Sequence, residues 1–249
     1  MLPFLKPRPK VPATASGERV YAIGDIHGEY ELLRKLLERI ASHWEASDQS
    51  ATDVRLLFLG DIIDRGPASK QCLRFITQLS SLNGVTCLKG NHEDLLLRSM
   101  AGDSDAQSIW LQNGGDATLA SYGIALPRSD EDSFDFGERV KAAIPRKHVA
   151  MLEAAPTHAQ SGGYFFAHAG VRPGTALNRQ DDFDLFFIRE EFTGSTAWHG
   201  AVVVHGHSVV DEVDMRDNRI AIDTGAYRTG KLSCICLDGT SRQILTVRR

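Results

Sequence analysis

Three short polar clusters follow apolar runs in the first part of the chain. They are Gly24-Asp25-Ile26-His27-Gly28, Gly60-Asp61-Ile62-Ile63-Asp64-Arg65-Gly66 and Gly90-Asn91-His92-Glu93. Each apolar run resembles a buried strand, and the carboxyl ends of such strands are where open α/β sheets build their sites. Because an unpaired buried charge is costly, packing alone does not explain carboxylate, imidazole and amide groups at three successive strand ends.

Two further junctions of the same kind carry His168 and His207, each after another apolar run. Carboxylate oxygen and imidazole nitrogen together suit Mn, Fe or Zn, and these clusters contain no thiolate to favour a structural zinc site. The potential ligands are too many for one tetrahedral metal. They suit two ions about 3.5–4 Å apart that share one carboxylate and activate a bridging hydroxide for in-line attack on phosphorus.

The elements that position the first three clusters alternate between strand and helix. Residues 19–23, 54–59 and 85–88 are apolar, and helical periodicity follows from about residue 29, after Pro67 and near His92. A repeat of roughly 30 residues matches a βαβ unit, so a parallel sheet with right-handed crossovers is expected.

The rest of the chain is more varied. Residues 102–137 predict small helices and loops beside the site, either a cap or a purely structural insertion. Helical segments are then expected at 145–154 and within 182–192, and apolar strands at 164–167 and 201–204. Four short strands separated by turns, at 209–213, 219–222, 232–237 and 243–247, predict a second, antiparallel or mixed sheet.

Composition limits the remaining possibilities. The 249 residues are enough for one domain with a large core, and the net charge of −4 argues against a general nucleic-acid surface. No apolar run approaches the roughly 18 residues of a membrane span. Residues 1–17, rich in proline, are expected to be a flexible tail or a docking segment. The four cysteines suit buried thiols in a reducing, cytoplasmic location.

The ordered clusters, together with His168-Ala169-Gly170 and Gly206-His207-Ser208, resemble the serine/threonine-specific phosphoprotein phosphatase family of calcineurin-like metallophosphoesterases, in its short bacterial type. The resemblance spans about residues 19–248. It implies an α/β fold in which two mixed sheets form a sandwich flanked by helices, with four α/β/β/α layers. The expected organisation is a single catalytic domain over residues 18–249, which carries the insertion at 102–137.

The resemblance also implies roles for individual residues. Two divalent ions, with Mn first and Fe or Zn as alternatives, would be bound by Asp25, His27, Asp61, Asn91, His168 and His207. Asp61 would bridge them. His92 would protonate the leaving oxygen with Asp64 as its orienting partner, and Arg65 and Arg189 would bind the phosphate. Tyr227 would face the pocket.

Some assignments have alternatives. His205 could replace His207 as ligand, since strand alternation does not separate them, and Glu93 suits a helix N-terminal acid better than a catalyst. Symmetrical dinucleoside tetraphosphatases are similar too, but usually carry Gln where His27 stands and lack the Asp64-Arg65 pair.

The leading functional interpretation is therefore a dinuclear phosphatase of phosphomonoesters, with phosphoserine or phosphothreonine in proteins as its substrate. The alternative is a bis(5'-nucleosyl)-tetraphosphatase. A phospho-binding module without catalysis is disfavoured, because all six ligands and His92 are present. A phosphoprotein or a small phosphorylated molecule is the expected partner. Neither a nucleic acid nor a membrane is expected as one.

Overall fold

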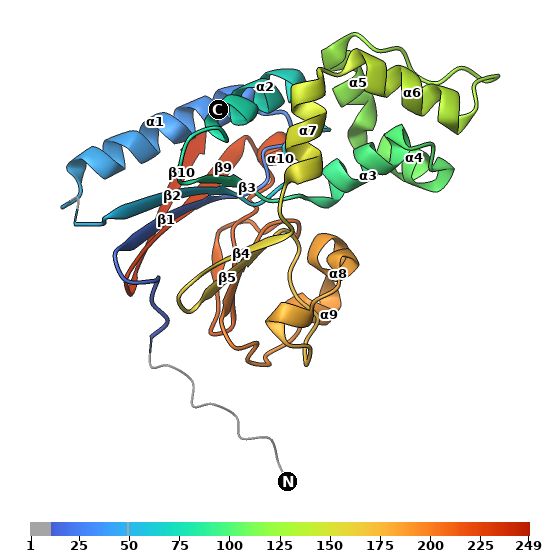
Figure 1. The fold of residues 1–249 in the computed structure, drawn as a ribbon. Coiled ribbons are helices and arrows are strands. Elements are labelled where there is room, and N and C mark those ends of the chain that lie inside the picture. The colour runs from blue at the N-terminus through green and yellow to red at the C-terminus, as the bar shows by residue number, and fades with distance from the viewer. Residues whose placement is uncertain (1–10, 49) are drawn as a thin grey trace.

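The computed structural model describes residues 11–48 and 50–249. Two five-stranded sheets pack against each other, and helices cover the outer face of each (Figure 1). This four-layer arrangement confirms the α/β sandwich expected from the sequence. The loops that carry the polar clusters follow strands of these two sheets, so the sheets determine where the clusters lie.

The first sheet has the strand order β10-β9-β1-β2-β3. Its parallel strands are β1 (Glu18–Ile23), β2 (Asp53–Phe58) and β3 (Val85–Cys87). Helices α1 (Tyr30–Ala46), α2 (Ser69–Leu79) and α3 (Asn91–Met100) follow them in turn. The β-α-β-α-β-α prediction is confirmed. The apolar positions of α1 and α2 are buried because they pack on this sheet.

The C-terminal hairpin corrects the prediction of a second sheet built from the last four strands. β9 (Lys231–Asp238) pairs antiparallel with β1, and β10 (Ser241–Arg248) pairs with β9, so both extend the first sheet. A period-two pattern shows which faces of a strand are buried, but it does not say which neighbour the strand pairs with. The hairpin brings the end of the chain back beside its first strand.

The second sheet has the order β4-β5-β6-β8-β7. Its strands are β4 (His158–Ser161), β5 (Tyr164–Ala167), β6 (Val202–His205), β7 (Asp214–Met215) and β8 (Arg219–Ala221). β4 is not expected from its polar sequence. The strand predicted at 209–213 is wrong: the ladder with β8 begins only at Asp214, because the chain first turns through the loop after His207.

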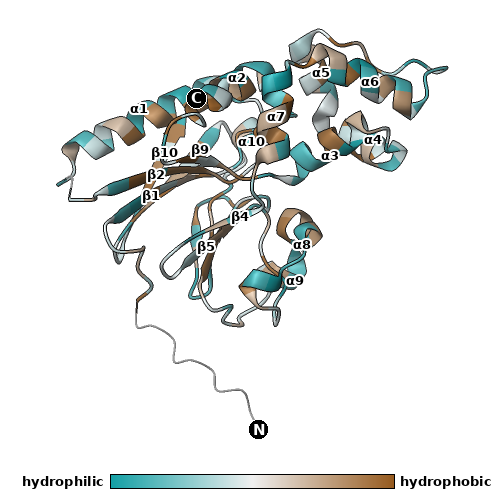
Figure 2. Cartoon of the chain, in the orientation of Figure 1, coloured by the Kyte–Doolittle hydropathy of each residue, from teal (hydrophilic) through white to brown (hydrophobic). Residues whose placement is uncertain are grey.

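The side chains of β1 show how the layers are held together. Val20 and Ala22 point into the cluster between the two sheets, while Tyr21 and Ile23 join the cluster beneath the helices. This alternation is the period of two that a strand imposes. Hydrophobic residues line the strands of both sheets, and the helices are hydrophilic on their exposed faces (Figure 2). α8 (Asp182–Phe187) and α9 (Glu190–Thr193) cover the second sheet.

The insertion is helical. It contains α4 (Ser104–Trp110), a kinked turn η1 (Leu111–Gly115), α5 (Asp116–Tyr122) and α6 (Ser133–Ala143), and α7 (Arg146–Ala154) leads on to the second sheet. The short segments η2 (Leu177–Arg179) and α10 (Ala226–Thr229) complete the elements. The structure therefore has small helices along this segment (Figure 1).

The N-terminal segment differs from the expected flexible tail of residues 1–17. The Thr14 N–H donates to the Gly239 carbonyl at 3.0 Å, the Gly163 N–H donates to Ala13, and the Tyr164 hydroxyl donates to Pro12. These contacts fix residues 12–14 against both sheets. Residues 1–10 lie outside the described residues. Within the described ranges, no helix has the length and apolar character needed to cross a membrane.

Candidate metal centre

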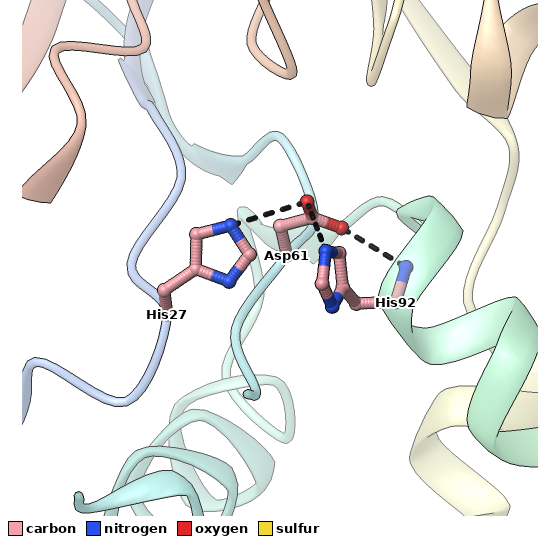
Figure 3. Close-up of side chains that lie close together, drawn as sticks. All are labelled: His27, Asp61 and His92. Atoms are coloured by element: carbon pink, nitrogen blue, oxygen red, sulfur yellow. Dashed lines mark hydrogen bonds and ion pairs between the residues drawn. The ribbon is translucent and has the colours of Figure 1, made fainter. Parts of the chain in front are cut away.

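The predicted site residues gather where strands of the two sheets end. Asp25 and His27 follow β1, Asp61 follows β2, and Asn91 and His92 are the first two residues of α3, the helix after β3. His168 and His207 follow β5 and β6 in the second sheet. All of these side chains are buried. Figure 3 shows His27, Asp61 and His92 converging from separate segments of the chain.

The backbone at the site is strained. Among the described residues other than glycine, a positive φ is found at His27, Asp61, Asp64, Arg65 and His207. Such conformations cost about 1–3 kcal/mol each and persist only where the surrounding structure enforces them. Every one of these residues was predicted to act at the site from its sequence alone. The strain therefore marks the same residues as the chemistry does.

The Asp61 carboxylate faces two groups of ligands. Its Oδ2 lies 3.4 Å from His27 Nε2 and 3.8 Å from His92 Nε2. Its Oδ1 lies 3.4 Å from His168 Nε2 on the other side. Burial alone would raise the pKa of Asp61, but the imidazoles of His168, His92 and His27 outweigh burial and hold it well below its usual range. An ionised carboxylate with one oxygen toward each group has the geometry of a bridging ligand.

The second group of ligand atoms is tightly packed. Asn91 Oδ1 lies 2.9 Å from both His168 Nε2 and His207 Nδ1, and these two nitrogens are 3.2 Å apart. Ligand atoms of Asp61, His168 and His207 all lie within 4.8 Å of one another. Burial lowers the pKa of His168, and it lowers that of His207 to about 2, which favours the neutral form of each ring. Neutral imidazole is the form that binds metal.

Backbone carbonyls orient two of the imidazoles. His27 Nδ1 is 2.8 Å from the Ile63 carbonyl, and His168 Nδ1 is 2.9 Å from that of Leu59. A carbonyl only accepts, so each Nδ1 carries the proton and each Nε2 presents its lone pair to Asp61. This is the arrangement that second-sphere partners give to metal-binding histidines.

Asp25 occupies a different position from the other ligands. Its Oδ2 accepts the His207 N–H at 3.0 Å, and its Oδ1 is buried without a hydrogen-bond partner. Burial, then Asp223, then Asp61 raise its pKa well above the usual range. Asp223 was not predicted to belong to the site. It lies two residues after the end of β8, so its place after another strand end was the signal that could have found it.

This donor set fits divalent cations. The orphaned Asp25 oxygen, the imidazole nitrogens of His27, His168 and His207, and the shared Asp61 carboxylate are donors of the kind that divalent cations bind. Three buried carboxylates, those of Asp25, Asp61 and Asp223, crowd together. Asp25, His27 and Asp61 would hold one ion, and Asp61, Asn91, His168 and His207 the other. Of the first group, the ligand atoms of His27 and Asp61 lie within 4.8 Å of one another and of a His92 nitrogen, and Asp25 is not part of that cluster.

His92 is better placed as a proton donor than as a ligand. Its Nδ1 lies 2.6 Å from Asp64 Oδ2, with both side chains buried. Burial by itself would lower the pKa of His92, but Asp61 and Asp64 together outweigh burial and raise it. A carboxylate at Nδ1 leaves Nε2 to face the centre, the orientation that a general acid requires.

The predicted phosphate-binding arginines lie at the rim. Arg65 Nη1 donates to His27 Nε2 at 2.9 Å, and its guanidinium lies 4.7 Å from the centre of the Tyr227 ring. Tyr227 therefore faces the site, as the resemblance implied. Arg189 is exposed, and its charge contributes to lowering the pKa of His168 and His207. Arg65 is therefore a half-buried positive charge beside the centre, and Arg189 is a solvent-exposed one.

His205 points away from the centre. Its Nδ1 donates to the Gly206 carbonyl at 3.0 Å, and its ring packs edge-on against Phe192 beneath α9. His207, two residues later, is the histidine that lies beside Asn91 and His168. The chain turns tightly at Gly206, where any Cβ would collide with the Asp25 carboxylate, so the side chains of His205 and His207 point in different directions.

Comparison with known proteins agrees with this geometry. The family model described as calcineurin-like phosphoesterase matches residues 18–230. An asymmetrical bis(5'-nucleosyl)-tetraphosphatase PrpE from Geobacillus sp. is 29% identical over 232 residues, covering 86% of this chain and 89% of its own length. The protein of that name from Geobacillus thermodenitrificans is 28% identical, covering 86% and 88%.

Solved structures share the fold. One named as a candidate diadenosine tetraphosphatase has a TM-score of 0.63 at 20% identity, covering 96% of this chain and 98% of its own. A protein serine/threonine phosphatase from Saccharomyces cerevisiae has a TM-score of 0.58 at 13% identity, covering 96% and 85%. At such identities the likeness shows the fold alone. With the family model matching most of the chain, the protein belongs to the calcineurin-like phosphoesterases, metal-dependent hydrolases of phosphoesters that use a dinuclear centre.

Proposed function

We propose that this chain hydrolyses dinucleoside tetraphosphates asymmetrically, to a nucleoside triphosphate and a nucleoside monophosphate. One observation carries the proposal: the similarity to the PrpE tetraphosphatases runs over 86% of this chain and 88–89% of theirs. It replaces the protein-phosphatase interpretation as the leading one. That interpretation depended on His27, Asp64 and Arg65, which argue against the symmetrical tetraphosphatases but not against asymmetrical ones.

The site residues would divide the work of phosphoryl transfer. When bound, the two ions supply positive charge to the phosphate oxygens and lower the pKa of the attacking water. Arg65 and Arg189 would bind further oxygens, because a guanidinium matches two phosphate oxygens and stays charged. His92, held by Asp64 at 2.6 Å, would give its Nε2 proton to the departing oxygen.

Hydrolysis of phosphomonoesters is the second candidate, with phosphoserine or phosphothreonine in proteins as substrate. The His92–Asp64 pair favours it, since a serine or threonine alkoxide is a poor leaving group that needs a proton donor. A departing nucleotide phosphate needs this help less. The two functions therefore differ in how strongly they depend on His92.

A direct comparison of kcat/KM on diadenosine tetraphosphate and on a phosphothreonine peptide decides between them. We expect the dinucleotide to be preferred, with ATP and AMP as its products. An Asp61→Asn protein prepared in parallel shows whether a contaminating phosphatase contributes. A preference for the peptide would reverse the order of the two candidates, and two ADP molecules per dinucleotide would exclude asymmetrical cleavage.

We further propose Mn²⁺ as the bound metal, because the donors mix carboxylate, amide and imidazole without thiolate. Metal analysis of protein purified without added metal tests this. Two equivalents of Mn are expected, and a preparation that contains Fe or Zn in its place would contradict the assignment.

A further inference from the structure

The Asp64 carboxylate is held by two donors from the helical insertion. Trp110 Nε1 lies 3.0 Å from Oδ1 and 2.9 Å from Oδ2, and the Thr118 hydroxyl donates to Oδ1 at 2.6 Å. His92 Nδ1 takes the remaining place on Oδ2. Trp110, Thr118 and Asp64 are fully buried. A buried carboxylate with donors on both oxygens cannot turn about its Cβ–Cγ bond without breaking hydrogen bonds.

Thr118 holds Asp64 at two points. Its Oγ1 also accepts the Asp64 backbone N–H at 3.0 Å, so one hydroxyl fixes both the strained backbone, where φ is 73°, and the side chain. The Ser69 hydroxyl lies 2.9 Å from Thr118 and 3.0 Å from the Asp64 nitrogen. The hydroxyls of Thr118 and Ser69 thus form a small polar cluster around Asp64, the orienting partner of His92.

Two glycines of the kinked turn η1 allow the insertion to approach the loop this closely. The Gly114 carbonyl accepts the Arg65 N–H at 3.1 Å, and a Cβ at Gly114 would lie 2.8 Å from that same nitrogen. A Cβ at Gly115 would press into the Trp110 indole. The insertion is thus shaped to fit the loop that carries Asp64 and Arg65.

We propose that Trp110 and Thr118 are positioning residues for phosphoester hydrolysis. They fix the plane of the Asp64 carboxylate, which fixes the ring of His92 with its Nε2 directed at the centre. The inference rests on the proposed function, in which His92 protonates the leaving oxygen. It gives the insertion at 102–137 a role in the chemistry beyond that of a structural addition.

The test compares the activity of variants on one substrate with a poor leaving group and one with a good leaving group. Thr118→Val removes the hydroxyl while keeping the shape, Trp110→Phe removes the N–H, and Thr118→Ser restores a hydroxyl. Ile109→Ala, on the exposed face of α4 beside Trp110, is the matched control. Phenyl phosphate has a poor leaving group and 4-nitrophenyl phosphate a good one, so only the first depends strongly on a proton donor.

We expect Thr118→Val and Trp110→Phe to lower kcat on phenyl phosphate about tenfold, part of the roughly 10²–10⁴-fold that a positioned acid contributes. The loss on 4-nitrophenyl phosphate should stay under about threefold. Thr118→Ser and Ile109→Ala should behave like the wild-type protein. Thermal unfolding of each variant shows whether it is folded.

A second readout does not depend on activity. The Nδ1 proton of His92, in its short bond to Asp64, should give a downfield ¹H resonance that disappears in His92→Asn. It should shift or broaden in Thr118→Val and Trp110→Phe and return in Thr118→Ser. If the wild-type protein does not cleave aryl phosphates, this resonance decides the question alone.

His92→Asn separates two kinds of failure. If it slows both aryl phosphates equally, His92 is not the acid and that part of the proposed function fails. If it discriminates between them while Thr118→Val and Trp110→Phe do not, or if the His92 proton is unmoved in those variants, the positioning role alone is overturned.

Discussion

The Glu93 carboxylate accepts the backbone N–H of Asp61 at 2.8 Å, across a separation of 32 residues. It also accepts the N–H groups of Ile62, Ile63 and Gly90. The bond to Gly90 caps α3, which confirms the interpretation of Glu93 as a helix N-terminal acid. The other bonds tie that helix to the loop of the predicted bridging ligand.

Glu93→Gln should therefore weaken both the fold and the metal site. The amide places an NH₂ group against backbone donors, at a cost of about 1–3 kcal/mol for groups left unpaired. Metal affinity should fall roughly 10- to 100-fold, as for other outer-sphere partners. Urea unfolding and metal titration measure the two effects. Asp94→Asn, in the same helical turn but partly exposed, is the control. Equal behaviour of the two variants would refute the role of Glu93.

Asp61→Asn should remove metal and activity together. The amide has one ligand oxygen in place of two, so it cannot bridge both groups. We expect less than one tightly bound ion per chain and a loss of at least about 100-fold in kcat/KM. Asp53→Asn, at the exposed start of the same strand, should retain both. Full metal content in Asp61→Asn would contradict a bridging role.

Arg65→Ala should weaken phosphate binding while leaving the metals in place. A hydrogen bond to a charged group contributes about 1.5–3 kcal/mol, so inhibition by inorganic phosphate should weaken roughly tenfold or more. Arg65→Lys keeps the positive charge but loses the planar guanidinium, so its inhibition constant for phosphate should lie between those of the wild-type protein and Arg65→Ala. Inhibition constants at fixed metal concentration measure this. Arg128→Ala, an exposed cation in the insertion, is the control. Unchanged phosphate inhibition in Arg65→Ala would exclude this contact.

The Glu131–Arg139 pair of the insertion should stabilise the protein only above strongly acidic pH. Two hydrogen bonds of 2.7 Å join them, and they lower the pKa of Glu131 from 4.5 to about 2. A lowered pKa gives stability that is fully present above pH 4.5 and is lost as the pH falls through 2. The Tm difference between the wild-type protein and Glu131→Gln should therefore be larger at pH 7 than at pH 3. A difference that grows toward pH 3 would contradict this sign.

Much of the frame was predictable because it is local. The apolar run of β1 and the helical spacing of Leu32, Leu33 and Leu36 are properties of consecutive residues, and the structure has a strand and a helix there. The pairing of β9 with β1 was not predictable in this way. It joins residues more than 200 positions apart, and the sequence of β9 suits either sheet. The strand predicted at 209–213 is absent because the chain turns there, and the apolar pattern does not show that turn.

Within the site, the residues that carry motifs were visible and their supporting partners were not. Asp61, His92 and His207 stand in short, unusual clusters after apolar runs. Trp110 and Thr118 stand in a segment that, by composition, is an ordinary helical insertion. Their meaning depends on one contact with Asp64, which exists only when the insertion folds back on the loop.

The sequence by itself determined the chemistry of this protein, because the types of ligand and their positions after strands are written in consecutive residues. Tertiary structure decided how that chemistry is oriented. It set which oxygen of Asp61 faces which histidine, turned His205 away while His207 faces inward, and brought Asp223 beside Asp25. These outcomes depend on distances between strands and loops far apart in the chain. No local pattern encodes such distances.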